Sequence, residues 1–156
     1  YKIGDTVKVE QVAPVKIKIA GRTKHFINAF GEELMVFNAD EAIKRACRDT
    51  GSTVEDYTAA PVYAAGGKHG HHQWLVEFSQ LPADLQGFAD SLDRHLKEVN
   101  SDYEAKRYKG LFLDGPEVVI AHKGLFDKWL GTTGKLGGQR KVPRLSNDRE
   151  FIVGNK

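Results

Sequence analysis

The chain has 156 residues, of which 40% are hydrophobic and 28% charged, a composition typical of a globular protein with one core. Its formal net charge of +2 is too small to indicate nucleic-acid binding by itself, and no apolar run approaches the roughly 20 residues of a membrane-spanning helix. The single cysteine, Cys47, excludes an internal disulfide and lies in a helical apolar pattern, so we expect a reduced, buried thiol in a cytoplasmic protein.

The N-terminal segment alternates apolar and polar side chains, as a half-buried strand does. Residues 1–12 and 15–20 flank a break at Pro14, and together they predict a β-hairpin with one solvated face. Gly21 ends this hairpin, and residues 24–29 predict one more extended stretch before the first helix.

Two helices are predicted from apolar side chains at helical spacing. The first begins at Asn38, which forms a capping box with Glu41, and ends at Gly51. The second follows Pro82 and carries the most regular apolar stripe of the chain. The members of that stripe are Leu85, Phe88, Ala89, Leu92, Leu96 and Val99.

Three further strands are predicted at residues 54–64, 72–78 and 118–121, and alternation in the second places Trp74 and Leu75 on opposite faces. Beyond the hairpin, the order of elements is therefore strand, helix, strand, strand, helix, strand. Such an order is that of a ferredoxin-like unit, in which two helices pack on one face of a mainly antiparallel sheet. We therefore expect an α+β fold: a ferredoxin-like split βαβ sheet with helices packed on it, plus an N-terminal β-hairpin.

The first stretch that can carry chemistry is a glycine-rich basic segment, residues 134–144. No carboxylate occurs between Lys128 and Asn147, which leaves a local positive patch. The glycines let the backbone approach a ligand closely, a lysine on such a loop can bring a compact charge to a phosphate, and Arg144 offers a bidentate fork. The segment is not a phosphate-binding Walker loop, because it lacks the Gly-Lys-Ser/Thr ending and the preceding strand. Composition alone leaves two interpretations open, an anion-binding loop or a flexible basic loop.

Three other motifs have both a functional and a local explanation. Asp5, which follows a glycine, can accept two hydrogen bonds from a ribose diol, or it can serve only a local turn. The histidines within residues 68–72 have no Asp, Glu or Cys near them in sequence, so we expect turn histidines and no metal site. Ser101 and Glu104 form a second capping box, which explains these residues without a ligand at the helix N-terminus.

Four motifs in a consistent order carry a resemblance to a known family, and they span nearly the whole chain. They are Tyr1-Lys2-Ile3-Gly4-Asp5, Ala20 to Asn28, Asn100 to Arg107, and Gly137 to Arg144. With these motifs the chain resembles the C-terminal region of the Gretchen Hagen 3 family, the auxin-responsive acyl acid–amido synthetases of the adenylate-forming superfamily. It looks close to bacterial members.

The resemblance implies a reaction in two steps. A carboxylic acid and ATP, with Mg²⁺ expected alongside the nucleotide, form an acyl-adenylate and pyrophosphate. The amine of an amino acid then displaces AMP and gives an amide. The acyl acid itself is not implied, because the acyl pocket of the family lies in its N-terminal domain.

The resemblance also implies roles for individual residues. Lys141 would be the mobile catalytic lysine that reaches the phosphate and acyl oxygens, where negative charge builds up during the reaction. Asp5 would hold the ribose hydroxyls of the adenylate. Gly138, Gln139 and Arg144 would belong to the nucleotide-binding set, with Arg144 either orienting the loop or contacting phosphate.

The domain organisation follows from the same resemblance. Residues 1–20 would be a hairpin belonging to the end of a missing N-terminal domain, and residues 21–156 would form a C-terminal lid domain. Gly21, Arg22 and Lys24 would form the hinge about which the lid swings between half-reactions. The expected partners are the N-terminal adenylation domain of the same protein and the acid and amino acid substrates, with neither nucleic acid nor membrane. We expect the isolated fragment to be inactive.

One alternative stays open, a ferredoxin-like ligand- or RNA-binding module without catalysis. Recognition of RNA on a sheet needs exposed aromatic side chains on which bases stack. The aromatic residues of this chain mostly lie at core spacing, which favours the synthetase interpretation over RNA binding.

Overall fold

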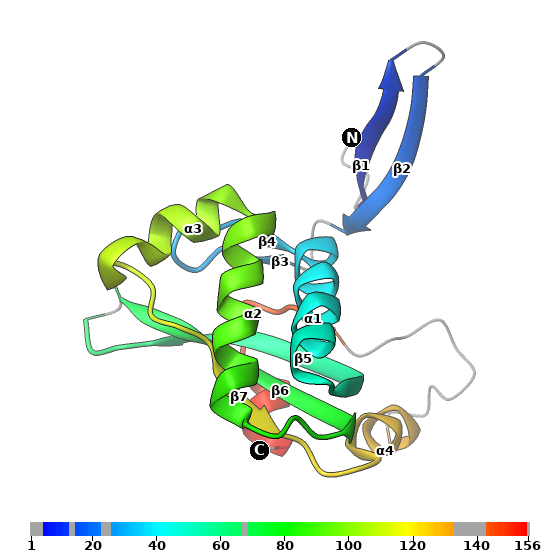
Figure 1. The fold of residues 1–156 in the computed structure, drawn as a ribbon, viewed down its shortest axis with the longest axis vertical. Coiled ribbons are helices and arrows are strands. Elements are labelled where there is room, and N and C mark those ends of the chain that lie inside the picture. The colour runs from blue at the N-terminus through cyan, green and yellow to red at the C-terminus, as the bar shows by residue number, and fades with distance from the viewer. Residues whose placement is uncertain (1–4, 13–14, 23–25, 67–68, 133–142, 156) are drawn as a thin grey trace.

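A computed structural model gives the fold of the chain (Figure 1). It describes residues 5–12, 15–22, 26–66, 69–132 and 143–155. The predicted N-terminal hairpin is confirmed: β1 (Asp5–Val12) pairs antiparallel with β2 (Val15–Arg22) and extends away from the rest of the fold. A shorter antiparallel pair follows, made of β3 (Phe26–Ile27) and β4 (Leu34–Met35). The strand β4 falls in no predicted element, because two residues are too few to show an alternating pattern.

The main sheet contains, among the described strands, three members in the order β5-β6-β7. The strands β5 (Thr53–Tyr63) and β6 (Gly70–Gln80) are antiparallel neighbours, whereas β7 (Glu117–Ile120) runs parallel to β6. Parallel neighbours need a long crossover, and the chain between β6 and β7 supplies one through two helices. Three of the four strands predicted for this sheet are confirmed, with small shifts at their ends. The first, predicted at residues 24–29, contributes β3, which pairs with β4 instead.

Helices make up most of the remaining described fold. They are α1 (Val36–Thr50), α2 (Leu85–Val99), α3 (Ser101–Arg107), the 3-10 turn η1 (Tyr108–Gly110), α4 (Leu125–Thr132) and α5 (Glu150–Asn155). The first helix begins before the predicted Asn38, whose Oδ1 accepts the Met35 N–H at 3.1 Å from inside the first turn. Gly51 ends that helix with a φ of 64°, as predicted. Within the described chain, every helix is too short or too polar to cross a bilayer.

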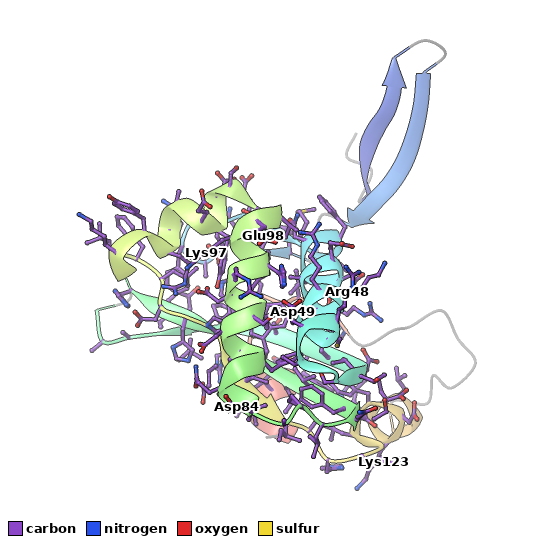
Figure 2. All side chains as sticks on the ribbon, viewed as in Figure 1. Arg48, Asp49, Asp84, Lys97, Glu98 and Lys123 are labelled. Carbon is purple, nitrogen blue, oxygen red and sulfur yellow. The ribbon has the colours of Figure 1, made fainter. Side chains whose placement is uncertain are left out.

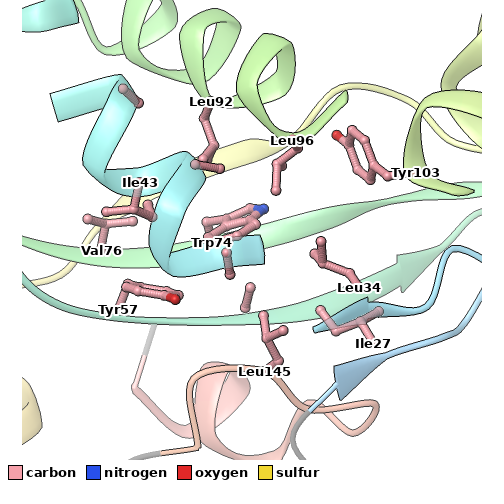
Figure 3. Packing of buried hydrophobic residues seen from close by; sticks show 14 of the residues in the cluster. Ile27, Leu34, Ile43, Tyr57, Trp74, Val76, Leu92, Leu96, Tyr103 and Leu145 are labelled. Carbon is pink, nitrogen blue, oxygen red and sulfur yellow. The ribbon is translucent and has the colours of Figure 1, made fainter. Parts of the chain in front are cut away.

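Helices cover both faces of the main sheet, and Trp74 and Leu75 of β6 point to opposite faces, as predicted. Trp74 belongs to a buried cluster with Ile43 of α1 and Leu92 of α2 (Figure 3). Leu75 belongs to a second buried cluster that includes Phe126 of α4 and Ile152 of α5. Removing a side chain of this size from water contributes about 1.5–3 kcal/mol, so these two clusters fix how the helices lie on the sheet.

The helices α1 and α2 are also joined by a histidine between two carboxylates. The Nε2 of His95 lies 2.6 Å from Asp49 Oδ2 on α1, and its Nδ1 lies 2.7 Å from Glu98 Oε2 on α2. Asp49 and Glu98, both labelled in Figure 2, therefore flank one ring. The hydrogen bond from His95, with help from Ser91, lowers the pKa of Asp49 to about 2. The bond between the buried His95 and Asp49 joins α2 to α1.

The loop between β3 and β4 is held to the sheet by a buried pair, Glu32 and His72. Their exposed fractions are 0% and 1%, and Glu32 Oε1 lies 2.7 Å from His72 Nε2. The other carboxylate oxygen accepts the Phe30 N–H at 2.7 Å. Burial raises the pKa of Glu32, but hydrogen bonding by His72 and the nearby backbone lowers it overall. His71 lies in β6, which corrects the expectation that it lies in a turn, and His72 lies in the strand predicted from residue 72 onward.

Candidate functional site

The N-terminal hairpin brings two predicted site segments side by side. In the β1–β2 register, Asp5 lies opposite Arg22, and Thr6 lies opposite Gly21. The residue expected at the ribose is therefore directly across the backbone ladder from the expected hinge. Lys24, the third hinge residue, lies outside the described residues. This pairing tests neither role, so both stay predictions.

Of the site residues predicted in the glycine-rich basic segment, Arg144 is described by the structure. Lys141, Gly138 and Gln139 lie outside the described residues, and their roles stay predictions. Arg144 follows Lys141 by three positions and lies at the start of the last described stretch, residues 143–155.

Backbone hydrogen bonds join the end of the segment to the edge of β5. Leu145 forms a parallel bridge with Ala59, whose N–H donates to the Arg144 carbonyl at 2.8 Å. The Thr58 hydroxyl donates to the Pro143 carbonyl at 2.6 Å. Leu145 is fully buried and belongs to the main hydrophobic cluster (Figure 3). The chain just after the predicted catalytic lysine is therefore fixed by both backbone and core contacts.

The Arg144 side chain adds a polar contact to this attachment. Its Nη1 donates to Asp40 Oδ1 of α1 at 2.6 Å, and its Nε lies 3.8 Å from Asp56 Oδ1 of β5. The guanidinium carbon lies 5.3 Å from the ring centroid of Tyr57, at the distance of a cation–π contact. Arg144 therefore touches a helix, a strand and an aromatic ring at the same time.

The Asp40 carboxylate is the centre of this arrangement. Its Oδ1 also accepts the Tyr57 hydroxyl at 2.6 Å, so one oxygen receives two short hydrogen bonds. Tyr57 is 3% exposed and its ring centroid lies 5.5 Å from that of Trp74. Burial and the charge of Asp40 raise the pKa of Tyr57 well above its usual range, which keeps the hydroxyl a donor. We call Asp40, Tyr57 and Arg144 the loop anchor.

The electrostatics of the loop anchor favour one of the two roles expected for Arg144. Burial lowers the pKa of Arg144, but the charge of Asp40, the hydrogen bond to it and the other groups around the guanidinium together raise that pKa overall, so the guanidinium stays charged. Asp56 is the second carboxyl group near Arg144, and burial raises its pKa. A guanidinium that already faces carboxylates has less positive field to offer a phosphate. These contacts are compatible with the orienting role, and both roles of Arg144 stay predictions.

The residues of the motif at Asn100 to Arg107 make structural contacts in the described chain. Asn100, rather than the predicted Ser101, caps α3, because its Oδ1 accepts the Tyr103 N–H at 2.7 Å. Tyr103 is 1% exposed and its hydroxyl donates to Asp93 at 2.7 Å. Arg107 donates to both oxygens of Asp93 at 2.7 and 2.8 Å. These residues pack α3 against α2.

Sequence reasoning does not identify Asp40, Asp56 or Tyr57 as site residues. An acidic residue near the start of a helix is ordinary, because the helix dipole favours it there. Tyr57 lies in a predicted strand, where an aromatic side chain is expected for packing alone. Their link to Arg144 depends on a contact between segments about a hundred residues apart, which single-sequence patterns do not carry.

Comparison with known proteins gives a family and a fold. A model of the GH3 family C-terminal domain matches residues 37–150, a range that includes the whole loop anchor. The fold is similar to that of a GH3.15 acyl acid amido synthetase, with a TM-score of 0.73 and 15% identity over 98% of this chain. It is also similar to AtGH3.15 acyl acid amido synthetase in complex with 2,4-DB, with a TM-score of 0.68 and 16% identity over 98% of this chain. The chain spans 30% of the length of either structure. No curated protein matches it.

Proposed function

The chain belongs to the GH3 family as a C-terminal domain, and from this premise we propose that it is the lid of an ATP-dependent acyl acid–amido synthetase. The family match over residues 37–150 is the observation that carries the proposal. The likeness of the fold to an acyl acid amido synthetase supports it. The N-terminal adenylation domain of the same protein would be its partner, and the lid alone would be inactive.

The proposed reaction has two balanced steps. An oxygen of a carboxylic acid attacks the α-phosphorus of ATP, supplied as its Mg²⁺ complex, and pyrophosphate leaves. The amine of an amino acid then attacks the acyl carbon, the bond from that carbon to the phosphate-bound oxygen breaks, and AMP leaves as the amine loses a proton. An acyl-adenylate also reacts with water, so a lid that closes over it serves the reaction by excluding solvent.

In this proposal Lys141 stabilises the charge that builds on the α-phosphate and acyl oxygens. A lysine ammonium is a compact charge on a flexible stem, which suits a group that enters the site in one half-reaction only. Asp5 accepts hydrogen bonds from the ribose hydroxyls, and Gly138 and Gln139 contribute to the nucleotide site. The hinge residues Gly21, Arg22 and Lys24 let the lid turn between the two steps.

The alternative of an RNA-binding module gains no support from the described residues. On β5 and β6, the aromatic residues Tyr57, Trp74 and Phe78 are 3%, 0% and 9% exposed. Tyr63, at the end of β5, is 49% exposed, and its ring lies 5.3 Å from that of Phe30. Helices cover both faces of the described sheet, so the rings of Tyr57, Trp74 and Phe78 are not accessible for base stacking.

Exchange of labelled pyrophosphate into ATP by the full-length protein tests the proposed function. We expect exchange that depends on an added carboxylic acid, because the first step is reversible and forms pyrophosphate. A panel of aliphatic and aromatic acids should contain at least one that supports it, and omission of the acid is the control. Absence of exchange with every acid, together with salt-sensitive binding of RNA, would instead favour the binding module.

A further inference from the structure

Exposed hydrophobic side chains gather where α3 ends, at the turn η1. Within the described chain, Tyr108, Leu111 and Phe112 are 64%, 61% and 48% exposed. One exposed hydrophobic residue is ordinary on a protein surface, whereas three within five positions of a single turn are typical of an interaction surface. The backbone is strained at this point, because Lys109 is a non-glycine residue with a φ of 52°.

The same turn carries two cations. The Lys109 ammonium lies 5.4 Å from the ring centroid of Tyr108, and the Lys106 ammonium lies 5.1 Å from that of Phe112. The carboxylates of α3 lie in its first turn, at the other end of the helix. We call Lys106, Tyr108, Lys109, Leu111 and Phe112 the tip. It presents ammonium groups beside exposed apolar side chains.

An acidic cleft of about 520 Å³ lies next to the tip, between α2 and the chain that leads into β7 (Figure 1). Four carboxylates, one guanidinium and one imidazole line it, and the first five belong to Asp90, Asp93, Asp114, Glu117 and Arg107. A volume of this size is that of a ligand pocket, so a tyrosine ring and an ammonium group can enter it. Arg107 also lies within the stretch that forms the tip, so the tip and the cleft adjoin.

The cleft keeps a negative charge beyond its internal ion pairs. Arg107 donates to both oxygens of Asp93, which neutralises one of the four carboxylates. Asp90 accepts a hydrogen bond from a neutral amide of the same helix at 2.9 Å. Asp114 lies 2.8 Å from His69, whose ring is charged only when it is protonated. A cation from outside is therefore attracted into the cleft.

We propose that this surface is a contact between two copies of the chain, in which the tip of each copy enters the acidic cleft of the other. The two halves have opposite charge, and both belong to this chain. In one copy the tip side chains are exposed, so they do not fill the cleft beside them. Because tip and cleft adjoin, a two-fold axis between them lets both contacts form at once, and the assembly closes as a dimer.

The tyrosine and the lysine of the tip have different parts in this contact. A tyrosine that enters a pocket at the centre of an interface carries much of the binding energy. Charge pairs across an interface mainly select the partner and its orientation, and salt screens them. Tyr108 therefore supplies affinity, and the pairing of Lys109 with the cleft supplies specificity. A contact limited to one turn and one cleft on each copy is small, so we expect a weak dimer.

Sedimentation equilibrium of the full-length protein, at concentrations up to about 1 mM, tests the proposal. We expect a monomer–dimer equilibrium that shifts toward monomer as salt is raised. Lys109→Glu and Asp90→Lys should each raise the dissociation constant about 100-fold, because like charges then meet at two equivalent contacts. The chain with both changes should bind more tightly than either single variant, because opposite charges face each other again. Tyr108→Ser should weaken the dimer about 10-fold or more.

Two exposed residues outside the tip and the cleft provide matched controls. Lys123→Glu, next to α4 (Figure 2), and Glu55→Lys, on β5, make the same two charge reversals. Neither should change the dissociation constant. Circular dichroism checks that each variant folds. If Lys109→Glu does not fold, Lys109→Ala removes the charge without reversing it, with a loss of about 10-fold expected.

Three results would overturn the proposal. The first is a protein that stays monomeric at the highest concentration, even if its cleft binds a small polycation such as spermidine. The second is an equal loss of affinity in the control variants, which would show a general effect of charge. The third is a double variant no tighter than the single ones. Pyrophosphate exchange takes no part in this test, so its outcome is independent of the proposed function.

Discussion

The Lys141→Ala variant of the full-length protein should form acyl-adenylate about 100- to 1,000-fold more slowly than the unaltered enzyme. Under the proposed function, negative charge develops on the α-phosphate as the carboxylate attacks, and the Lys141 ammonium would stabilise that charge in a site from which water is excluded. Because this contact is made in the transition state, kcat and kcat/KM for ATP should fall together. Rapid-quench measurement of pyrophosphate release reports the step directly.

Two controls make this result specific to Lys141. Lys135→Ala removes a lysine from the same glycine-rich segment and should have a much smaller effect on pyrophosphate release. Lys141→Arg keeps the charge but replaces a compact ammonium by a planar fork, so it should restore only part of the rate. Equal losses for Lys135→Ala and Lys141→Ala would show that the segment acts through its general charge, and the assigned role would be wrong.

The largest loss of stability is expected from Glu32→Ala. This change leaves His72, which is 1% exposed, without the carboxylate that accepts its hydrogen bond. Breaking a buried pair by removing one partner typically costs about 3–5 kcal/mol. Denaturant unfolding monitored by circular dichroism should show this as a lower midpoint. The β3–β4 loop should also lose its protection from hydrogen exchange, because Glu32 also accepts the Phe30 N–H.

An exposed pair of the same chemistry provides the comparison. His69 lies 2.8 Å from Asp114, whose side chain is 60% exposed, so Asp114→Ala should cost less than about 1 kcal/mol. The pH dependence has a defined sign. The folded-state pKa of Glu32 is lowered, so its contribution is present above the unfolded-state value and is lost as the pH falls through the folded-state value. Equal midpoints for the two alanine variants would contradict the structural role given to Glu32.

Much of the fold follows from local patterns in the sequence. Alternation in residues 72–78 correctly places Trp74 and Leu75 on opposite faces, because a strand of the central sheet contacts a different helix layer on each side. Gly51 correctly marks the end of α1, since its φ of 64° lies in the region that glycine favours. These features depend on residues that are close together in the chain, so a single sequence is enough to predict them.

The features that the sequence did not predict depend on contacts between residues that are far apart in the chain. Asn38 has the residue type of a helix cap, but its side chain lies inside the first turn, where its Nδ2 donates to the Val99 carbonyl at 3.0 Å. The pairing of His72 with Glu32 joins residues 40 positions apart, so a search for acidic neighbours in sequence does not find it. The partner of Arg144 is 104 positions away. Such contacts depend on how α1, α2 and the β3–β4 loop pack with the sheet, which local patterns do not determine.

The central claim is that the protein containing this chain activates a carboxylic acid on the α-phosphate of ATP, and an isotope experiment tests it most directly. The acid is labelled with heavy oxygen (¹⁸O) at its carboxylate, and the products of one turnover with ATP and an amino acid are examined by mass spectrometry. The account predicts that AMP carries one oxygen from the acid, because that oxygen bridges carbon and phosphorus in the acyl-adenylate. Labelled inorganic phosphate formed together with ADP, or amide formed without label in AMP, would contradict it.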